Sequence, residues 1–205
     1  MIAIVDYGMG NVASVTMAFK RLGYEVILTD DQNKLRAASH IVLPGVGSFQ
    51  AAMDEIEQRG LLDFLKEMAQ EKPFLGICLG MQLLFSEGYE GGKTKGLDLI
   101  PGTVERIETD YLLPHIGWNG LEIKPGNDAF QPYEGKHVYF VHSFQAKTDK
   151  DFLVATSEYG TEVPAIVKKD HVYGIQFHPE KSGEVGVNLL KTFLQEVAYV
   201  SHSSN

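Results

Sequence analysis

The sequence predicts an α/β protein with a central, mostly parallel sheet flanked by helices and an added antiparallel portion. Three observations support this fold class. In the first half, strand-like apolar runs alternate with segments of helical periodicity, which is the pattern of βα units and a parallel sheet. In the second half, short strand-like segments follow one another with turn signals between them. The 205 residues are 44% hydrophobic, which suffices for one sizeable core.

The first half begins with a predicted strand at Ile2–Val5 and a helix from Asn11, a residue type that favours the N-cap. Apolar residues recur along this helix at helical spacing: Val12, Val15, Ala18, Phe19 and Leu22. Further strands are predicted at Val26–Thr29 and Ile41–Leu43, and a long helix from about Phe49 to Gln70.

The second half contains six predicted short strands and one long helix. The strands are expected at Thr103–Ile107, Gly120–Ile123, His137–Val141, Leu153–Ser157, Ala165–Val167 and Val172–Gln176. The helix is expected from Glu184 to about Val200, and its apolar face comprises Leu189, Leu190, Phe193, Leu194 and Val197. Residues 1–200 are expected to form a single domain, and the tail 201–205 to be frayed.

The composition argues against several functional classes. The net charge of −9 disfavours nucleic acid and anionic membranes as partners, because both would require a basic face. A single cysteine excludes an internal disulfide framework, and a usable thiol suits a reducing, cytoplasmic location. The first residues are typical of a strand rather than a signal peptide, and no apolar stretch approaches the length of a membrane span.

The only cysteine, Cys78, lies where an apolar strand meets a helix. The run Pro73–Ile77 is typical of a buried strand, and Leu79–Phe85 of a helix. Gly76 and Gly80 flank the cysteine at the spacing of a nucleophile elbow, whose tight turn holds the central residue in a strained conformation. The start of the helix would favour the thiolate. Most lone cysteines only pack in the core, but the elbow indicates a nucleophile.

A second segment supplies a base and an acid. His178 follows a predicted strand, and Glu180 comes two residues later, beyond a proline that fixes the local backbone. None of the other six histidines combines this strand-end setting with a nearby acid. Alone, such a segment is more typical of a surface loop. Together with the cysteine elbow it indicates a nucleophile, base and acid constellation made of Cys78, His178 and Glu180.

Two other classes of function stay open at this point. Gly8-Met-Gly10-Asn-Val-Ala13 follows a strand and fits the dinucleotide-binding pattern, with Asp30 at the place of the ribose-binding acid. This pattern would suit an oxidoreductase. However, no later segment provides hydride chemistry, and the glycine pattern alone has low specificity. A binding module on the same fold is the other alternative, which an inert Cys78 would favour.

The segments Gly76–Gln82 and Gln176–Glu180 resemble the signatures of the class I (triad) glutamine amidotransferases. Five ordered segments resemble one family within that class, the glutaminase subunits of imidazole glycerol phosphate synthase: Asp6–Asn11, Pro44–Phe49, Pro114–Asn119, Tyr139–Phe144 and Glu180–Ser182. Phe144 is a small departure from the family's pattern, in which tyrosine is expected as often at this position. The resemblance implies a flavodoxin-like sheet. Triad glutaminases of vitamin B6, anthranilate or purine synthesis are the nearest competing interpretation.

The predicted chemistry is acyl transfer from the side-chain amide of glutamine. Thiolate attack creates an oxyanion, and the N–H of Leu79, just after the nucleophile, is placed to donate to it. The resemblance assigns a second donor to the N–H of Val46, beside Gly47, after a peptide flip that the glycines would permit. His178 would protonate the departing ammonia and then activate water, while Glu180 holds the imidazole tautomer.

The resemblance also implies glutamine-binding residues and a partner. Gln82, one helical turn past the nucleophile, Glu90, and the backbone of Gly45, Ser143 and Phe144 would bind glutamine. No acceptor site is recognisable in the sequence, so ammonia would pass directly to a (β/α)8-barrel cyclase subunit, which forms imidazole glycerol phosphate and aminoimidazole carboxamide ribonucleotide. The expected assembly is a heterodimer that needs no metal or cofactor. The implied partner contacts are Asn11, Trp118, Tyr139 and Lys181.

Overall fold

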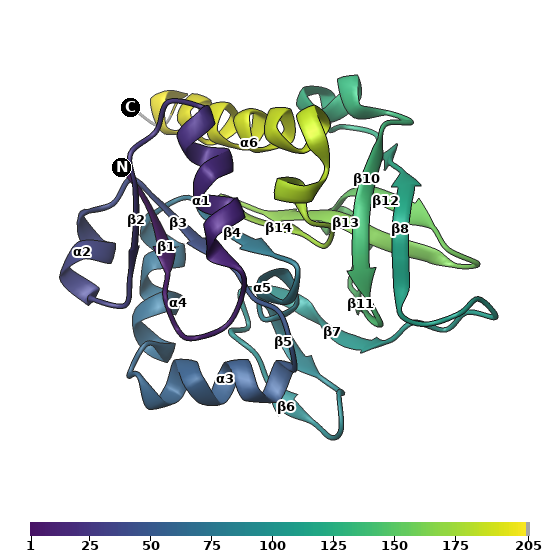
Figure 1. The fold of residues 1–205 in the computed structure, drawn as a ribbon, viewed down its shortest axis with the longest axis horizontal. Coiled ribbons are helices and arrows are strands. Elements are labelled where there is room, and N and C mark those ends of the chain that lie inside the picture. Colours follow the sequence, from purple (N-terminus) through teal and green to yellow (C-terminus); the bar gives the residue numbers. More distant parts are fainter. Residues whose placement is uncertain (204–205) are drawn as a thin grey trace.

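A central eight-stranded sheet organises the protein in the computed structural model, which describes residues 1–203 and the side chains of residues 1–196. Its strands run in the order β2-β1-β3-β4-β14-β13-β12-β9 (Figure 1). They span Ile2–Val5 (β1), Val26–Thr29 (β2), His40–Leu43 (β3), Phe74–Ile77 (β4), Glu122–Ile123 (β9), Leu153–Glu158 (β12), Glu162–Lys169 (β13) and Val172–Ile175 (β14). The first five strands are parallel and the last three join antiparallel. This arrangement confirms the predicted fold class.

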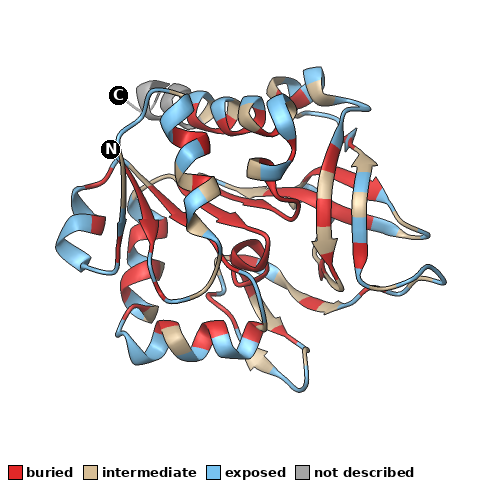
Figure 2. Ribbon diagram, in the orientation of Figure 1, coloured by how far each residue is buried: buried red, intermediate tan, exposed pale blue. Residues whose placement is uncertain are grey.

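Helices cover both faces of this sheet (Figures 1 and 2). Helices α1 (Val12–Arg21) and α6 (Gly183–Ser203) pack on one face, where their apolar residues join one buried core. Helices α2 (Gln32–Ala37), α3 (Phe49–Gln58) and α4 (Leu62–Glu71) supply the core on the other face. The periodic positions of α1 are buried as predicted, with Val15, Ala18 and Phe19 at most 4% exposed.

The structure corrects two predicted helices and adds one that was not predicted. The long helix predicted from Phe49 to Gln70 is two helices, because Gly60 takes a left-handed φ of 68° between them. The helix predicted at Leu79–Phe85 is the single turn α5, Leu79–Gln82, because Phe85 begins strand β5. Helix α2 was not predicted, although Asp31 caps its N-terminus through the N–H groups of residues 33 and 34.

Two small sheets complete the fold beside the central one. Strands β5 (Phe85–Gly88), β6 (Thr94–Lys95), β7 (Ile100–Arg106) and β11 (Phe144–Lys147) form one of them. Strands β8 (His115–Gly120) and β10 (His137–His142) form an antiparallel pair. The strand predicted at Gly120–Ile123 is therefore wrong in its start, because Gly120 ends β8 and the short β9 follows. Three 3-10 turns lie at Asp128–Tyr133, Lys150–Phe152 and Pro179–Lys181.

The last helix continues past its predicted end at Val200 to Ser203, so residues 201–203 of the predicted tail are helical. Residues 204–205 lie outside the described part, as does the side chain of Val197. Within the described residues, no helix combines the length and apolar character needed to cross a membrane.

Candidate active site

Two neighbouring parallel strands bring the predicted nucleophile and base together. Strands β4 and β14 pair with Ile77 opposite Ile175, so both end at the same edge of the sheet. Cys78 follows β4 directly, and its N–H donates to the Ile175 carbonyl at 2.7 Å. His178 follows β14 by three residues. The pairing of these two strands therefore joins residues that lie 100 positions apart, at the edge where α/β proteins place their ligands.

Cys78 occupies the strained elbow that the glycine spacing predicts. Its φ of 56° and ψ of −115° are unfavourable for a residue with a side chain. The flanking glycines have no room for a Cβ: at Gly76 it would lie 2.4 Å from the Gly80 carbonyl oxygen, and at Gly80 only 1.9 Å from the Leu43 oxygen. Since α5 is one turn long, its dipole contributes less to the thiolate than expected, and His178 becomes the main stabilising group.

His178 and Glu180 form a buried pair. Nδ1 of His178 lies 2.7 Å from Oε1 of Glu180, and the two side chains are 8% and 4% exposed. Burial alone would lower the pKa of His178, but the Cys78 thiol and the Glu180 carboxylate outweigh it and raise this pKa to about 9. The imidazole is therefore protonated near neutral pH when it faces a thiolate, which is the charge state of a Cys–His ion pair.

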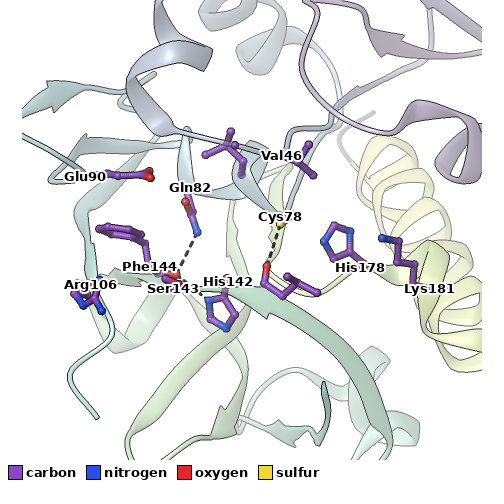
Figure 3. Close-up of a pocket in the computed structure, with 13 residues that line it drawn as sticks. Val46, Cys78, Gln82, Glu90, Arg106, His142, Ser143, Phe144, His178 and Lys181 are labelled. Carbon is purple, nitrogen blue, oxygen red and sulfur yellow. Dashed lines mark hydrogen bonds between the residues drawn. The ribbon is translucent and has the colours of Figure 1, made fainter. Parts of the chain in front are cut away.

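A cavity of about 440 Å³ opens in front of these residues (Figure 3). Ten predicted site residues line it: Val46, Gly47, Cys78, Leu79, Gln82, Glu90, Ser143, Phe144, His178 and Lys181. Gly45, Glu180 and Asn11 instead border a separate cavity of about 30 Å³, which also touches Cys78 and His178. Trp118 and Tyr139 line neither cavity. The residues predicted from separate segments thus converge on one pocket, which Lys181 also lines, whereas the partner contacts Trp118 and Tyr139 lie apart from it.

Hydrogen bonds hold two side chains at the far end of the pocket, Gln82 and Glu90. Gln82 is 5% exposed, and its amide nitrogen donates to the Phe144 carbonyl at 3.2 Å and to Oε1 of Gln176 at 3.1 Å. Because both N–H groups are engaged, its Oε1 is the atom left to accept from a ligand. Glu90 accepts from the N–H of Phe49, at the first turn of α3, at 3.1 Å.

The predicted oxyanion donors are not yet convergent in this structure. The N–H of Leu79 donates to the Gly45 carbonyl at 3.2 Å, so this donor is occupied. Val46 is 44% exposed beside Gly47, whose φ is 106°. The Gly45 carbonyl and the Val46 N–H belong to one peptide unit. Rotation of that unit would free Leu79 and present Val46 in the same movement.

Three residues that line the cavity were not predicted as site residues from the sequence: Arg106, Val141 and His142. Arg106, at the end of β7, faces the pocket from the same side as Phe144 (Figure 3). His142 ends β10, is 6% exposed and contacts the buried His115 at 2.9 Å. The predicted strands over 103–107 and 137–141 placed Arg106 and His142 at strand ends, but only the three-dimensional arrangement turns those ends toward Cys78.

The predicted partner contacts lie on the surface around the triad. Trp118 is 54% exposed and lies across the β8–β10 pair from Tyr139, with ring centroids 5.8 Å apart. Asn11 and Lys181 are exposed. Because more than half of the residue is accessible, Trp118 does not pack in the core. An exposed tryptophan beside a tyrosine is typical of a protein interface.

The alternative dinucleotide pattern has a different structural role. Gly10 packs against the Pro44–Gly45 segment, where a Cβ would lie 3.3 Å from the nitrogen of Gly45. Asp30 pairs with Arg59 at 3.0 Å. In the described part of the chain, no group of three or more His, Cys, Asp or Glu side chains could hold a metal ion. The glycines therefore fit the packing of two loops at the sheet edge.

Comparison with known proteins identifies the class. The family model "Glutamine amidotransferase class-I" matches residues 3–197. The chain belongs to this family. Similar solved structures include a glutamine amidotransferase (TM-score 0.77, 20% identity, 97% of this chain and 100% of that one) and PurLQS from Thermotoga maritima (TM-score 0.72, 21% identity, 95% and 97%). At these identities the solved structures support the fold alone.

Closer relatives narrow the identification within the class. The chain is 54% identical over 191 residues to imidazole glycerol phosphate synthase subunit HisH of Exiguobacterium sibiricum, with 93% of both chains covered. It is 50% identical to the HisH subunit of a Geobacillus species (94% and 95% covered) and 44% identical to that of Listeria monocytogenes (100% and 99%). At this identity and coverage the chain is a member of the HisH subunits of imidazole glycerol phosphate synthase, which confirms the predicted family.

Proposed function

We propose that this chain is the glutaminase of imidazole glycerol phosphate synthase and hydrolyses glutamine to glutamate and ammonia for histidine biosynthesis. The observation that carries the proposal is the placement of Cys78 on a strained elbow, beside a buried His178–Glu180 pair at the end of the next strand. Residues 1–200 would act as one domain, in agreement with the family match over 3–197. We place the enzyme in the cytoplasm, where a reducing environment keeps the thiol usable.

In the proposed mechanism the Cys78 thiolate attacks the amide carbon of glutamine. His178, protonated because of its neighbours, gives its proton to the departing nitrogen and then takes one from the water that hydrolyses the thioester. Glu180 holds Nδ1 of the imidazole, so that Nε2 is the atom available to the reaction. Each step uses a group that the fold already places at the edge of the sheet.

The amino-acid end of glutamine is proposed to bind at the far end of the cavity. Glu90 and Oε1 of Gln82 are acceptors for its ammonium group. Arg106 is the cation suited to its carboxylate, with the backbone of Ser143 and Phe144 as further contacts. Gly45, which borders the adjoining small cavity, is proposed to contribute its backbone as well. This orientation points the side-chain amide toward Cys78.

Control is proposed to reside in the Gly45–Val46 peptide. In the present arrangement its carbonyl blocks the Leu79 N–H. After a flip, Leu79 and Val46 would donate to the oxyanion, with Gly47 supplying the backbone freedom. One missing donor typically costs on the order of 10²- to 10³-fold in rate, so this peptide can act as a switch.

The ammonia is proposed to pass to a cyclase subunit that docks on the face with Asn11, Trp118, Tyr139 and Lys181. The relatives' names support a multi-subunit synthase. The test is glutamate release from glutamine by this chain alone, then with the barrel cyclase and its ribonucleotide ligand. Weak activity alone and strong stimulation in the complex are expected. No release under either condition would contradict the proposed function.

A further inference from the structure

The β8–β10 pair carries two buried histidines to which the proposed mechanism gives no role. His115 and His142 lie opposite each other in the strand register and are 0% and 6% exposed. Nδ1 of His115 lies 2.9 Å from Nε2 of His142. The His115 ring stacks on Tyr159, with centroids 3.9 Å apart, and on Phe140 at 4.8 Å. The two rings are therefore held in one geometry.

Each end of this pair meets a hydrogen-bonding group. Nδ1 of His142 lies 2.8 Å from the carbonyl oxygen of Phe144. At the other end, Nε2 of His115 lies 3.0 Å from Oδ1 of Asn119, whose Nδ2 donates to the Glu158 carbonyl at 2.9 Å. The result is a continuous chain of contacts from Asn119, on β8, to the wall of the glutamine pocket.

Counting protons along this chain of hydrogen bonds, from Asn119 to the Phe144 carbonyl, assigns most of the donors and acceptors. A carbonyl only accepts, so Nδ1 of His142 carries the proton and its Nε2 accepts from Nδ1–H of His115. Burial lowers the pKa of both histidines, to about 4 for His142, so both rings are neutral at pH 7. Nε2 of His115 is then left without a proton, and it needs a donor.

The side-chain amide of Asn119 is the group that can meet this need. In the present arrangement its nitrogen serves the Glu158 carbonyl and its oxygen faces His115. Turned over, the nitrogen would donate to His115 and complete the chain, at the expense of its contact with Glu158. The two orientations exchange one hydrogen bond for another, so the amide has two arrangements of similar cost.

The inner end of the chain reaches a residue that binds the ligand. The Phe144 carbonyl accepts from His142 and also from Nε2 of Gln82, which uses both lone pairs of the oxygen (Figure 3). Gln82 and Phe144 both line the cavity. The orientation of Gln82, and with it the Oε1 left for a ligand, therefore depends on a carbonyl that His142 holds.

The outer end of the hydrogen-bond chain, Asn119, lies on strand β8, which also carries the exposed residues Ile116 and Trp118. Along β8, Ile116 and Trp118 are 58% and 54% exposed, while His115 is fully buried. Alternate residues of a strand point to opposite faces, so β8 presents its apolar residues outward and His115 and Asn119 inward. A contact with Ile116 or Trp118 on the outer face of β8 thus acts on the same strand that carries Asn119 and His115.

We propose that His115 and His142 are positioning residues for glutamine, which fix the Phe144 carbonyl and through it Gln82, and that the Asn119 amide completes or interrupts their hydrogen-bond chain. The identity of the ligand rests on the proposed function. His115 and His142 do not touch the reacting atoms in this account. Their effect is on affinity for glutamine and not on the chemical step.

The test measures glutamine binding by calorimetry in a Cys78→Ala chain, which cannot turn the ligand over. Adding His115→Phe keeps a ring for stacking but removes both nitrogens, and the dissociation constant should rise roughly 3- to 10-fold, the size of one lost hydrogen bond. Tyr159→Phe is the matched control, since it keeps the stacked ring and removes only a hydroxyl bonded to the Leu112 carbonyl. Its affinity should be unchanged. Equal affinity of the His115→Phe chain and its parent would overturn the proposal.

A second pair of variants separates positioning from bulk packing. His142→Asn can place an amide nitrogen near the Nδ1 position and should retain most of the affinity, whereas His142→Leu should lose it. In the active complex, His115→Phe should raise KM by the same factor and leave kcat within about twofold. A fall in kcat with KM unchanged would contradict a positioning role.

The proton assignment is testable in the unmodified protein, without any variant. Nitrogen NMR of ¹⁵N-histidine-labelled chain should show His142 protonated on Nδ1 and not on Nε2. The opposite tautomer would overturn the proposal. A Cys78→Ala chain that binds no glutamine at all, while His142 shows the expected tautomer, would instead count against the proposed function.

Discussion

The two halves of the active site differ in how complete they are. On the side of β4 and β14, Cys78, His178 and Glu180 are buried and fixed by short contacts. On the side of β3, Val46 and Gly47 are exposed, and the Gly45 carbonyl accepts from the Leu79 N–H, the donor proposed for the oxyanion. The comparison indicates that the nucleophile and its base are held in place by the fold, whereas the proposed oxyanion hole depends on the orientation of one peptide.

The packing explains this difference. The elbow has no free volume, because Cβ atoms at Gly76 or Gly80 would overlap neighbouring backbone. The loop after β3 is anchored at its start by Tyr7, whose hydroxyl donates to the Pro44 carbonyl at 2.5 Å, whereas Val46 and Gly47 are exposed. Anchoring before the Gly45–Val46 peptide and exposure after it suit a local flip that leaves the sheet undisturbed.

The largest effect is expected from a substitution in the complete half of the site, which Cys78, His178 and Glu180 form. Cys78→Ala removes the nucleophile and should lower glutamate release in the complex by at least about 10⁴-fold. Because the side chain is small and buried, the melting temperature should change little. Release at the wild-type rate by this variant would contradict the Cys78 mechanism.

A substitution in the incomplete half should have the next largest effect. Val46→Pro removes the N–H that the flipped peptide would present, and kcat in the complex should fall roughly 10²- to 10³-fold. Val46→Ala is the matched control, since it keeps the N–H and trims an exposed side chain. The assay is steady-state glutamate release with the partner and its ligand. Similar rates for the two variants would exclude Val46 as a donor.

The pH dependence tests the charge state of the complete half. His178 must carry a proton to release ammonia, and its pKa of about 9 places the alkaline fall of kcat/KM near that pH. The Glu180 carboxylate is one of the groups that raise this pKa, so Glu180→Gln should move the alkaline fall to lower pH. The pH–rate profile of both proteins measures this, and an upward shift would show that the sign is wrong.

The smallest effect is expected from a substitution on the face where the cyclase subunit is proposed to dock. Trp118→Ala should weaken cyclase binding about 10- to 30-fold, as expected for an aromatic anchor. Its thermal stability should stay near wild type because the side chain is 54% exposed. Titration calorimetry with the cyclase measures the affinity. Unchanged affinity would remove Trp118 from the proposed interface.

Local patterns predicted where Cys78 and His178 lie, but they did not predict all the residues that line the surrounding pocket. The elbow around Cys78 and the strand end before His178 depend on residues near in sequence, so spacing and periodicity were sufficient. Arg106 and His142 depend on how β7 and β10 turn toward the sheet, which no local pattern encodes. The state of Gly45 could not be predicted, because the choice between two peptide orientations depends on contacts across loops.

The same distinction applies to the fold. The parallel strands were predicted because each is a short apolar run with clear boundaries. The break at Gly60 was missed because the apolar spacing continues on both sides of it, in α3 and α4. Strand β5 was missed because Phe85 follows a helical pattern, yet pairs with Ile100 fifteen residues further along the chain. The left-handed glycine at residue 60 and the pairing of β5 with β7 each outweighed the local periodicity.

The central claim is most directly tested by comparing two reactions of Cys78 in one protein. Alkylation by iodoacetamide needs the thiolate but no oxyanion hole, whereas glutamine hydrolysis needs both. On addition of the cyclase and its ribonucleotide, we expect hydrolysis to rise by about 10²- to 10³-fold, while alkylation of Cys78, with glutamine absent, changes by less than about threefold. If both rates rise together, or if the free chain already hydrolyses glutamine at the full rate, the difference between the two halves is contradicted.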